Sequence, residues 1–320
     1  MTPITRSVRA VFRTEAVIDW LEIEITVAQA TQFQWVQKAL RHHFNDGITP
    51  HVRAIEPGAG GSSTRFRIVL NDGHCRVHAT VRAAIEMLHR RFSLSGPVTV
   101  SALEIALDFY PSDSGAVADL AGMVQRLQGS LEVDGRSHRF VSSDGRRKKL
   151  CSFDTPNENA TFYINNRWDP CSWRVYYKMT DRGNRLPLSL HRARVEVTLQ
   201  GGELAKYGIG NACDLFEMDF AKLATLFHFR RFKPFSDLVA GKSKVIAHSI
   251  LRATRRERNF VSLYGFGRQS YYRDKRTNRP RNKGLPYPRK YSVHTVADEE
   301  LKQVVSDRLH DLNRNFRKNS

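Results

Sequence analysis

The sequence of 320 residues contains few cysteines and no long apolar run. Cys75, Cys151, Cys171 and Cys213 are widely spaced and form no Cys-x-x-Cys motif, so neither a disulfide framework nor a zinc site is indicated. No stretch approaches the roughly 20 apolar residues of a membrane span, and no apolar run typical of a signal peptide follows the basic N-terminus. We therefore expect a cytoplasmic protein with reduced thiols and no membrane association.

Acidic residues are scarce relative to basic ones. The chain has 32 Asp and Glu against 51 Lys and Arg, which gives a formal net charge of +19 and a pI of about 10.1. Such an excess predicts a polyanionic partner. Nucleic acid is favoured over a membrane surface, because no basic amphipathic helix with exposed large apolar residues stands out.

Much of the positive charge lies near the C-terminus. Residues 252–291 contain 13 Lys and Arg and two acidic residues, a net charge of +11, with tyrosines and prolines interleaved. This composition predicts an extended segment that follows a phosphate backbone and stacks aromatic rings on bases, although a solvated tail is the alternative. The candidate DNA-binding residues are Arg268, Tyr271, Tyr272, Arg273, Lys275, Arg276, Arg279, Arg281 and Lys283.

Several catalytic motifs are missing. The chain has no Walker A loop, so it is not expected to be its own helicase, and no Gly-x-Ser-x-Gly motif for acyl transfer. Residues 57–63 are rich in Gly and Ser but lack the Lys-Ser/Thr ending, which predicts a linker or hairpin loop. None of the 12 histidines forms a His-x-His metal motif, and the Arg, His-x-x-Arg and Tyr set of a tyrosine recombinase has no convincing match.

Hydrophobic periodicity predicts an α+β fold with a largely antiparallel sheet, helices packed on one face and a basic helical C-terminal region. The expected strands include residues 17–27, 64–70, 98–110, 138–142, 161–165, 173–179 and 193–199, and residues 74–80 are expected to pair with 64–70 in a hairpin. The expected helices are residues 31–44, 81–92, 115–127, 214–232, 245–264 and 298–318. We place a domain division after residue 235.

Three of the expected strands have one apolar face and one polar face, because side chains alternate along a strand. The polar faces of residues 98–110, 173–179 and 193–199 together carry Glu104, Asp108, Arg174, Tyr176, Lys178, Arg194 and Glu196. A tyrosine between two cations on one strand face is unusual, and such a face must meet water, carboxylates or an anion.

This set of side chains suits phosphoryl transfer. Glu104, Asp108 and Glu196 supply hard oxygen ligands for Mg²⁺ or Mn²⁺, and such a metal polarises a phosphoryl oxygen. The two arginines and the lysine can hold a phosphate and neutralise charge in the transition state. The hydroxyl of Tyr176 can attack phosphorus and form a covalent phosphotyrosine, and we expect the nearby cations to lower its pKa.

Two alternatives stay open at this point. Arginine and glutamate on neighbouring antiparallel strands often pair across a solvent-facing surface without any catalytic role. Tyr177 would replace Tyr176 as the nucleophile if a β-bulge shifted the phase of the strand.

Three segments in order resemble the replication initiation factor family of rolling-circle plasmids and filamentous phages, the Rep_trans type. Residues 102–110 (ALEIALDFY) are similar to its R-x-D-x-x-x-D strand, residues 161–178 to its Y-x-G-s…R-x-Y-x-K stretch, and residues 192–199 (RARVEVTL) to its R-x-E strand. Residues 18–25 also look like the family's first strand. The sequence departs from the pattern where Ala102 replaces an arginine, Glu104 an aspartate, and Asn165-Asn166 a Gly-Ser pair.

The resemblance implies a metal-dependent endonuclease that nicks one strand of its replication origin, becomes joined to the 5′ phosphate and leaves a 3′-hydroxyl primer. It implies that Tyr176 is the nucleophile and that Glu104, Asp108 and Glu196 hold the metal, which agrees with the roles assigned above to Arg174, Lys178 and Arg194 as phosphate-binding cations. Residues 1–235 would be the nicking domain, and residues 236–320 would contact DNA. The implied partners are double-stranded origin DNA, single-stranded DNA, and a host helicase and polymerase, with a homodimer as one option. The alternative is a non-catalytic DNA-binding accessory protein or repressor.

Overall fold

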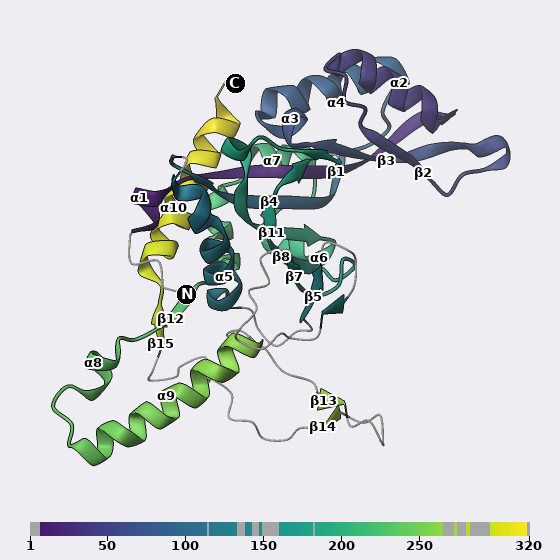
Figure 1. Cartoon of the computed structure of the whole chain (residues 1–320). Helices are drawn as coiled ribbons and strands as arrows, with labels where there is room; N and C mark the ends of the chain where they lie inside the picture. Colours follow the sequence, from purple (N-terminus) through teal and green to yellow (C-terminus); the bar gives the residue numbers. More distant parts are fainter. Residues whose placement is uncertain are drawn as a thin grey trace.

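The computed structural model describes residues 7–113, 115–132, 138–142, 147–148, 160–181, 183–264, 272–273, 280–281 and 295–318. Its centre is a nine-stranded sheet with the strand order β2-β3-β1-β4-β11-β8-β7-β5-β6, in which every recorded pairing is antiparallel (Figure 1). Its strands are β1 (Phe12–Gln32), β2 (His51–Ile55), β3 (Ser62–Asn71), β4 (Thr99–Pro111), β5 (His138–Ser142), β6 (Arg147–Lys148), β7 (Ala160–Ile164), β8 (Cys171–Lys178) and β11 (Arg192–Gln200).

Most of the helices pack against this sheet, as predicted from the sequence, but the helices at residues 235–239 and 244–264 pack on each other and project away from it (Figure 1). They are α1 (Val8–Val11), α2 (Phe33–Phe44), α3 (Asp72–Cys75), α4 (His78–Phe92), α5 (Leu120–Ser130), α6 (Gly202–Lys206), α7 (Ala212–Glu217), α8 (Phe235–Val239), α9 (Lys244–Tyr264) and α10 (Glu299–Arg317). Short 3-10 turns and small strand pairs connect them: η1 (Ala59–Gly61), η2 (Gly115–Asp119), η3 (Leu188–Leu190), η4 (Phe220–Leu226), β9 (Thr180–Asp181) with β10 (Asn184–Arg185), β12 (Arg230–Phe232) with β15 (Thr295–Ala297), and β13 (Tyr272–Arg273) with β14 (Pro280–Arg281).

Strict alternation along the central strands creates the core. On β4 the side chains of Leu103, Ile105, Leu107 and Phe109 are all at most 1% exposed. The helix α5 contributes Leu120, Met123, Val124 and Leu127 to the same apolar cluster. Burying this face removes a large apolar area from water, which stabilises the sheet and leaves its opposite face free for polar side chains.

Two expectations about individual elements were wrong. Residues 74–80 form no hairpin strand, because the side chain of Asn71 accepts a hydrogen bond from the backbone N–H of His74 and starts α3. The partners of β3 are instead β1 and β2, and residues 57–61 belong to the loop between β2 and β3, while Ser62 and Ser63 already pair with β1.

The continuous helix expected over residues 214–232 is broken into α7, η4 and β12. Asn211 and Asp214 form a capping box that starts α7. Asp219 then accepts a hydrogen bond from the N–H of Ala221 and starts a separate turn.

The terminal helix α10 packs back against the sheet. Its buried residues, which belong to the same apolar cluster as β4, are Leu301, Val304, Val305, Leu309, Leu312 and Phe316. The preceding strand β15 pairs with β12. The division after residue 235 stays a prediction, and the structure adds that residues 295–317 share the core of the sheet.

Among the described segments, no helix is both long enough and apolar enough to cross a lipid bilayer.

Candidate functional site

The predicted polar side chains share one face of the three central strands. Arg194 on β11 lies opposite Asp108 on β4 and opposite Tyr176 on β8. Glu196 lies opposite Arg174 on β8. The pairing of β8 with β11 runs without a register shift from Cys171 to Lys178, so the phase predicted for this strand is the one observed.

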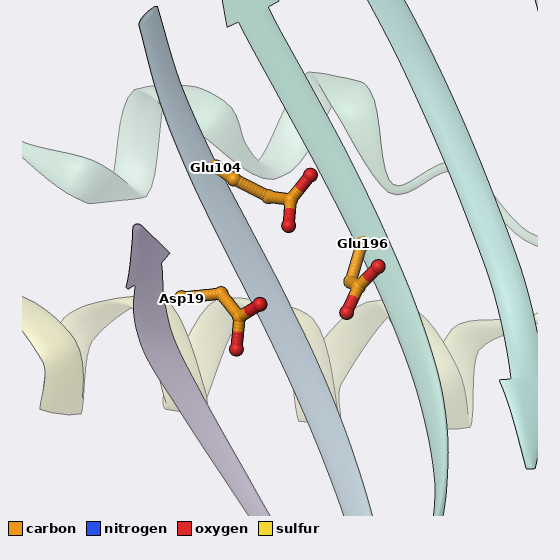
Figure 2. A group of neighbouring side chains, drawn as sticks. All are labelled: Asp19, Glu104 and Glu196. Carbon is orange, nitrogen blue, oxygen red and sulfur yellow. The ribbon is translucent and has the colours of Figure 1, made fainter. Parts of the chain in front are cut away.

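An acidic group of three carboxylates lies on this face, and one member was not predicted. Asp19, Glu104 and Glu196 each offer an oxygen, and these oxygens all lie within 4.8 Å of one another. Figure 2 shows the three side chains turned toward one another from β1, β4 and β11. We call these residues the acidic triad.

A β-bulge in β1 brings Asp19 into the acidic triad. The pairing with β4 passes from Ile18↔Ile105 to Trp20↔Glu104 and skips Asp19. Bulges of this kind redirect a side chain and are common near functional sites. The signal in the sequence is the three-residue spacing of Ile18 and Leu21, which are both buried and therefore break the two-residue alternation.

Asp108 was expected among the metal ligands, but the structure places it outside the acidic triad. Nε and Nη2 of Arg194 each lie 2.5 Å from an oxygen of Asp108, and Nε of Arg192 lies 3.1 Å from Oδ1. Both oxygens of Asp108 are therefore occupied by guanidinium groups. Asp108 and Arg194 are each only 1% exposed, so they form a buried ion pair that ties β4 to β11.

Arg174 bridges two members of the acidic triad. Its Nη2 donates to Oε1 of Glu104 at 2.7 Å, and its Nε lies 2.7 Å from Oε2 of Glu196. Thr198 also donates to Glu104, and Lys178 forms an ion pair with Asp181 at 3.1 Å. The ion pairs between arginine and glutamate on neighbouring strands, which the sequence left open as an alternative, are thus present in the structure.

Tyr176 lies beside the acidic triad. Its hydroxyl donates to Oε1 of Glu196 at 2.6 Å. Burial and the negative charge of Glu196 raise the pKa of the Tyr176 phenol, although Arg194 and Arg174 oppose this. The cations act to lower this pKa, but burial of the phenol and the charge of Glu196 outweigh them, so the expected net lowering of the pKa was wrong.

Tyr177 points to the opposite, apolar face of β8. Its ring packs against the core, and its hydroxyl lies 3.2 Å from Nδ1 of His191. Burial raises its pKa. This position separates Tyr177 from the acidic triad, in agreement with the predicted strand phase.

The acidic triad fits a divalent cation. Burial and the nearby Glu196 raise the pKa of Glu104 to about 7, while Arg174 opposes the shift. Burial likewise raises the pKa of Glu196, whose Oε2 accepts no well-aligned hydrogen bond from the described residues. Burial also acts to raise the pKa of Asp19, but Arg194, Lys178 and Arg174 outweigh it and the pKa lies below the usual value. Crowded, buried carboxylates of this kind are the hard donor set that Mg²⁺ or Mn²⁺ prefers.

A pocket of about 940 Å³ opens above this polar face. Asp19, Glu104, Arg174 and Lys178 line its interior. The side formed by β1, β2 and β3 contributes Trp20, His51, Arg53 and Arg67, and the side formed by β7, β8 and the turn between them contributes Tyr163, Asn165, Arg167 and Trp168. Two members of the acidic triad, Asp19 and Glu104, therefore line a pocket whose walls also carry cations, carboxylates and aromatic rings.

Most of the predicted DNA-binding residues of the basic segment lie outside the described residues, namely Arg268, Tyr271, Lys275, Arg276, Arg279 and Lys283. Tyr272, Arg273 and Arg281 belong to the short pairing of β13 with β14, for which we describe the backbone only. Their contact with DNA stays a prediction.

No protein-family model and no curated protein matches the chain. Among solved structures, it is similar to a rolling circle replication initiator protein from Geobacillus stearothermophilus, with 14% identity and a TM-score of 0.35 over 69% of this chain and 88% of that chain. It is also similar to the regulatory subunit of aspartate kinase from Thermus flavus, with 11% identity and a TM-score of 0.21 over 63% of this chain and 93% of that chain. An aspartate kinase from Synechocystis has 8% identity and a TM-score of 0.20 over 62% of this chain and 42% of that chain. At these values the likenesses carry no functional argument, and the proposals below rest on the geometry of the site.

Proposed function

We propose that the chain is a rolling-circle replication initiator, a metal-dependent endonuclease and strand transferase that nicks one strand of its origin DNA. The observation that carries this proposal is the hydrogen bond from Tyr176 to Glu196, a member of the acidic triad whose other two residues line the adjacent pocket together with Arg174 and Lys178. A nucleophile, a carboxylate that accepts its proton and a hard-ligand metal site are the parts that phosphoryl transfer requires.

Asp19, Glu104 and Glu196 are the residues proposed to hold the metal. When bound, Mg²⁺ or Mn²⁺ polarises a phosphoryl oxygen and cancels the negative charge that raises the pKa of Tyr176. Arg174 occupies two of these carboxylates in the present arrangement, at 2.7 Å from each. Binding of a metal therefore requires Arg174 to turn away, and its side chain, which lines the pocket, is then free for a phosphate.

The covalent step is a displacement at phosphorus. Oη of Tyr176 forms a bond to the phosphorus while the bond from phosphorus to the 3′ oxygen of the preceding nucleotide breaks. The phenol proton passes to Glu196, and the leaving 3′ oxygen takes a proton from water. The products are a 5′-phosphotyrosine and a free 3′-hydroxyl, so the energy of the phosphodiester is kept for strand rejoining and the 3′ end can prime synthesis.

The three cations of the site are assigned different tasks. Arg174 and Lys178 line the pocket and are proposed to contact the phosphate. Arg194 is 1% exposed and held by Asp108, Asp19 and Glu196, so its proposed task is to position the strands that carry the reacting groups.

The wider function includes partners that the described residues do not test. We propose that the basic segment at residues 268–291 contacts double-stranded origin DNA, while the pocket takes the single strand to be cut. A host helicase and polymerase would extend the 3′-hydroxyl, since the chain has no Walker A motif.

The test is a gel assay for a covalent protein–DNA adduct. The full chain is mixed with Mn²⁺ and a supercoiled plasmid that carries the DNA flanking its own gene. Nicked circles and a protein–DNA band that survives SDS are expected, and both should disappear with EDTA and in Tyr176→Phe. Tyr177→Phe is the matched control and should retain both.

A non-catalytic DNA-binding protein is the second candidate, favoured by the fact that the site's carboxylates are already paired with arginines. DNA binding without nicking under Mg²⁺ or Mn²⁺ would support this candidate over the endonuclease. An adduct that persists in Tyr176→Phe would contradict the assigned nucleophile.

A further inference from the structure

A largely exposed tryptophan lies at the edge of the pocket. Trp168 is 78% exposed and lies in the turn between β7 and β8. Exposing a large aromatic ring to water is unfavourable, and a ring that is mostly exposed contributes little to the stability of the fold. An exposed tryptophan that lines a polar pocket has a ring face available for a ligand there.

The turn that carries Trp168 is held in one conformation. The amide of Gln200 donates to the backbone oxygens of Arg167 at 2.8 Å and Asp169 at 2.7 Å. Asp169 accepts from the N–H of Asn166 at 2.7 Å, and buried Asn165 donates to the oxygen of Cys171 at 2.7 Å.

The backbone at the start of the turn is also unusual. Asn165 has a φ of 65°, in the left-handed region that non-glycine residues rarely adopt. Strain of this kind persists where surrounding contacts impose it, and it is concentrated at ligand sites. The hydrogen bonds from Gln200 connect the backbone of the turn directly to β11, the strand that carries Glu196.

The surroundings of Trp168 carry positive charge and a second aromatic ring. The guanidinium of Arg167 lies 5.2 Å from the centre of the Trp168 ring. Both residues line the pocket, together with the partly buried Trp20 and with Arg53 and Arg67, which form ion pairs with Glu22. Cations that contact phosphates, interleaved with rings that stack on bases, are the combination by which proteins hold single-stranded nucleic acid.

We propose that the turn at residues 165–170 is a stacking platform for single-stranded DNA, in which Trp168 stacks on one base and Arg167 contacts the adjoining phosphate. This inference rests on the proposed function, from which we take the strand to be DNA, and it adds the turn that binds this strand. A base in duplex DNA is already stacked on its neighbours, so the platform selects an unpaired strand and places its backbone over the acidic triad.

The test measures binding without cleavage. A fluorescent single strand of about 20 nucleotides is titrated with the full chain in EDTA, and its anisotropy is followed. Trp168→Ala should weaken binding by about 5- to 150-fold, the range expected when one stacked base is lost, and Trp168→Phe should restore part of it. Trp35→Ala is the matched control, because Trp35 is 53% exposed on α2, carries Lys38 at 5.6 Å and does not line the pocket.

Salt dependence separates the two members of the platform. Stacking releases no counterions, so Trp168→Ala should leave the slope of log affinity against log salt unchanged. Arg167→Ala should reduce that slope by about 0.7, the value for one phosphate contact on a single strand. The same titration with a duplex should show no dependence on Trp168.

The outcomes are separable from those of the adduct assay. Equal affinity of Trp168→Ala, Trp35→Ala and the unchanged chain for the single strand would overturn the platform, even if the protein nicks DNA. A Trp168-dependent affinity in a protein that never nicks would sustain the platform and contradict the endonuclease. No binding of the single strand at all would overturn the platform as well.

Discussion

Asp19 and Asp108 both contact Arg194, but their carboxylates have different surroundings. Asp108 is 1% exposed and has both oxygens paired with guanidinium groups, whereas the side chain of Asp19 is 16% exposed and lines the pocket. Removing one partner of a buried ion pair leaves a charge without compensation. Asp108→Asn should therefore lower the free energy of unfolding by about 3–5 kcal/mol, measured by urea denaturation.

Asp19→Asn is the matched comparison for that measurement. Arg194 keeps its bidentate contact with Asp108 in this variant, so the loss of stability should be clearly smaller. Equal losses in the two variants would contradict the assignment of Asp108 to structure and Asp19 to the acidic triad.

Metal binding should depend on the acidic triad and not on Asp108. A cation that binds only the folded state raises its melting temperature by mass action. Mn²⁺ should raise the melting temperature of the unchanged chain, and the increase should be lost in Asp19→Asn and in Glu104→Gln. Differential scanning calorimetry with and without Mn²⁺ measures it, and Glu203→Gln is a control that should keep the increase, because Glu203 lies on α6, pairs with Lys206 and is not part of the acidic triad. A full increase in Asp19→Asn would place the metal elsewhere.

At the scale of secondary-structure elements, the sequence predicted best where alternation is unbroken. Along β8, β11 and residues 103–109 of β4, every second residue is apolar, so the opposite face with Glu104, Tyr176 and Glu196 could be predicted from the sequence. Asp19 could not be placed, since the bulge in β1 depends on the pairing with β4. Residues 74–80 were likewise predicted as a strand but are not one, because the side chain of Asn71 caps and starts a helix that the hydrophobic periodicity did not reveal.

Glu300 makes several of the contacts between the start of α1 and α10, beside the ion pair of Arg9 with Asp307. Glu300 on α10 accepts hydrogen bonds from the Ser7 hydroxyl at 2.7 Å, the Val8 N–H at 2.6 Å and Arg126 at 2.9 Å. Burial acts to raise the pKa of Glu300, but these hydrogen bonds outweigh it and the pKa lies below its usual value. The ionised form is therefore bound more favourably in the folded state than in the unfolded one.

The sign of the pH dependence follows from that lowered pKa. The stabilisation is complete above the ordinary pKa of glutamate and is lost as pH falls through the lower, folded value. Glu300→Gln should therefore be less stable than the unchanged chain at neutral pH, and the difference should shrink under acid conditions. Urea denaturation at a series of pH values measures it, with exposed Glu299→Gln as the control. A difference that is constant with pH would show that the charge of Glu300 is not involved.

Over the whole molecule, the positive charge is unevenly distributed. The acids of the site are neutralised internally by Arg174, Arg192 and Arg194, so the site itself adds little to the net charge of +19. The excess lies elsewhere, with nine Lys and Arg and one acidic residue in residues 268–291. Composition alone could predict this asymmetry, whereas the geometry of the pocket required the fold.

This asymmetry predicts where the salt dependence of DNA binding originates. Each phosphate contact with duplex DNA contributes about 0.9 to the slope of log affinity against log salt. Replacing residues 268–291 by a neutral Gly-Ser linker of equal length should therefore reduce the slope by as much as about 8, if all nine cations contact phosphates. The equal length matters because β15, which follows the segment, pairs with β12. Equal slopes for the two proteins would assign duplex binding to the pocket and the sheet. A loss of affinity for duplex DNA alone, with single-strand affinity still dependent on Trp168, would show that the basic segment binds the duplex and the pocket binds the single strand.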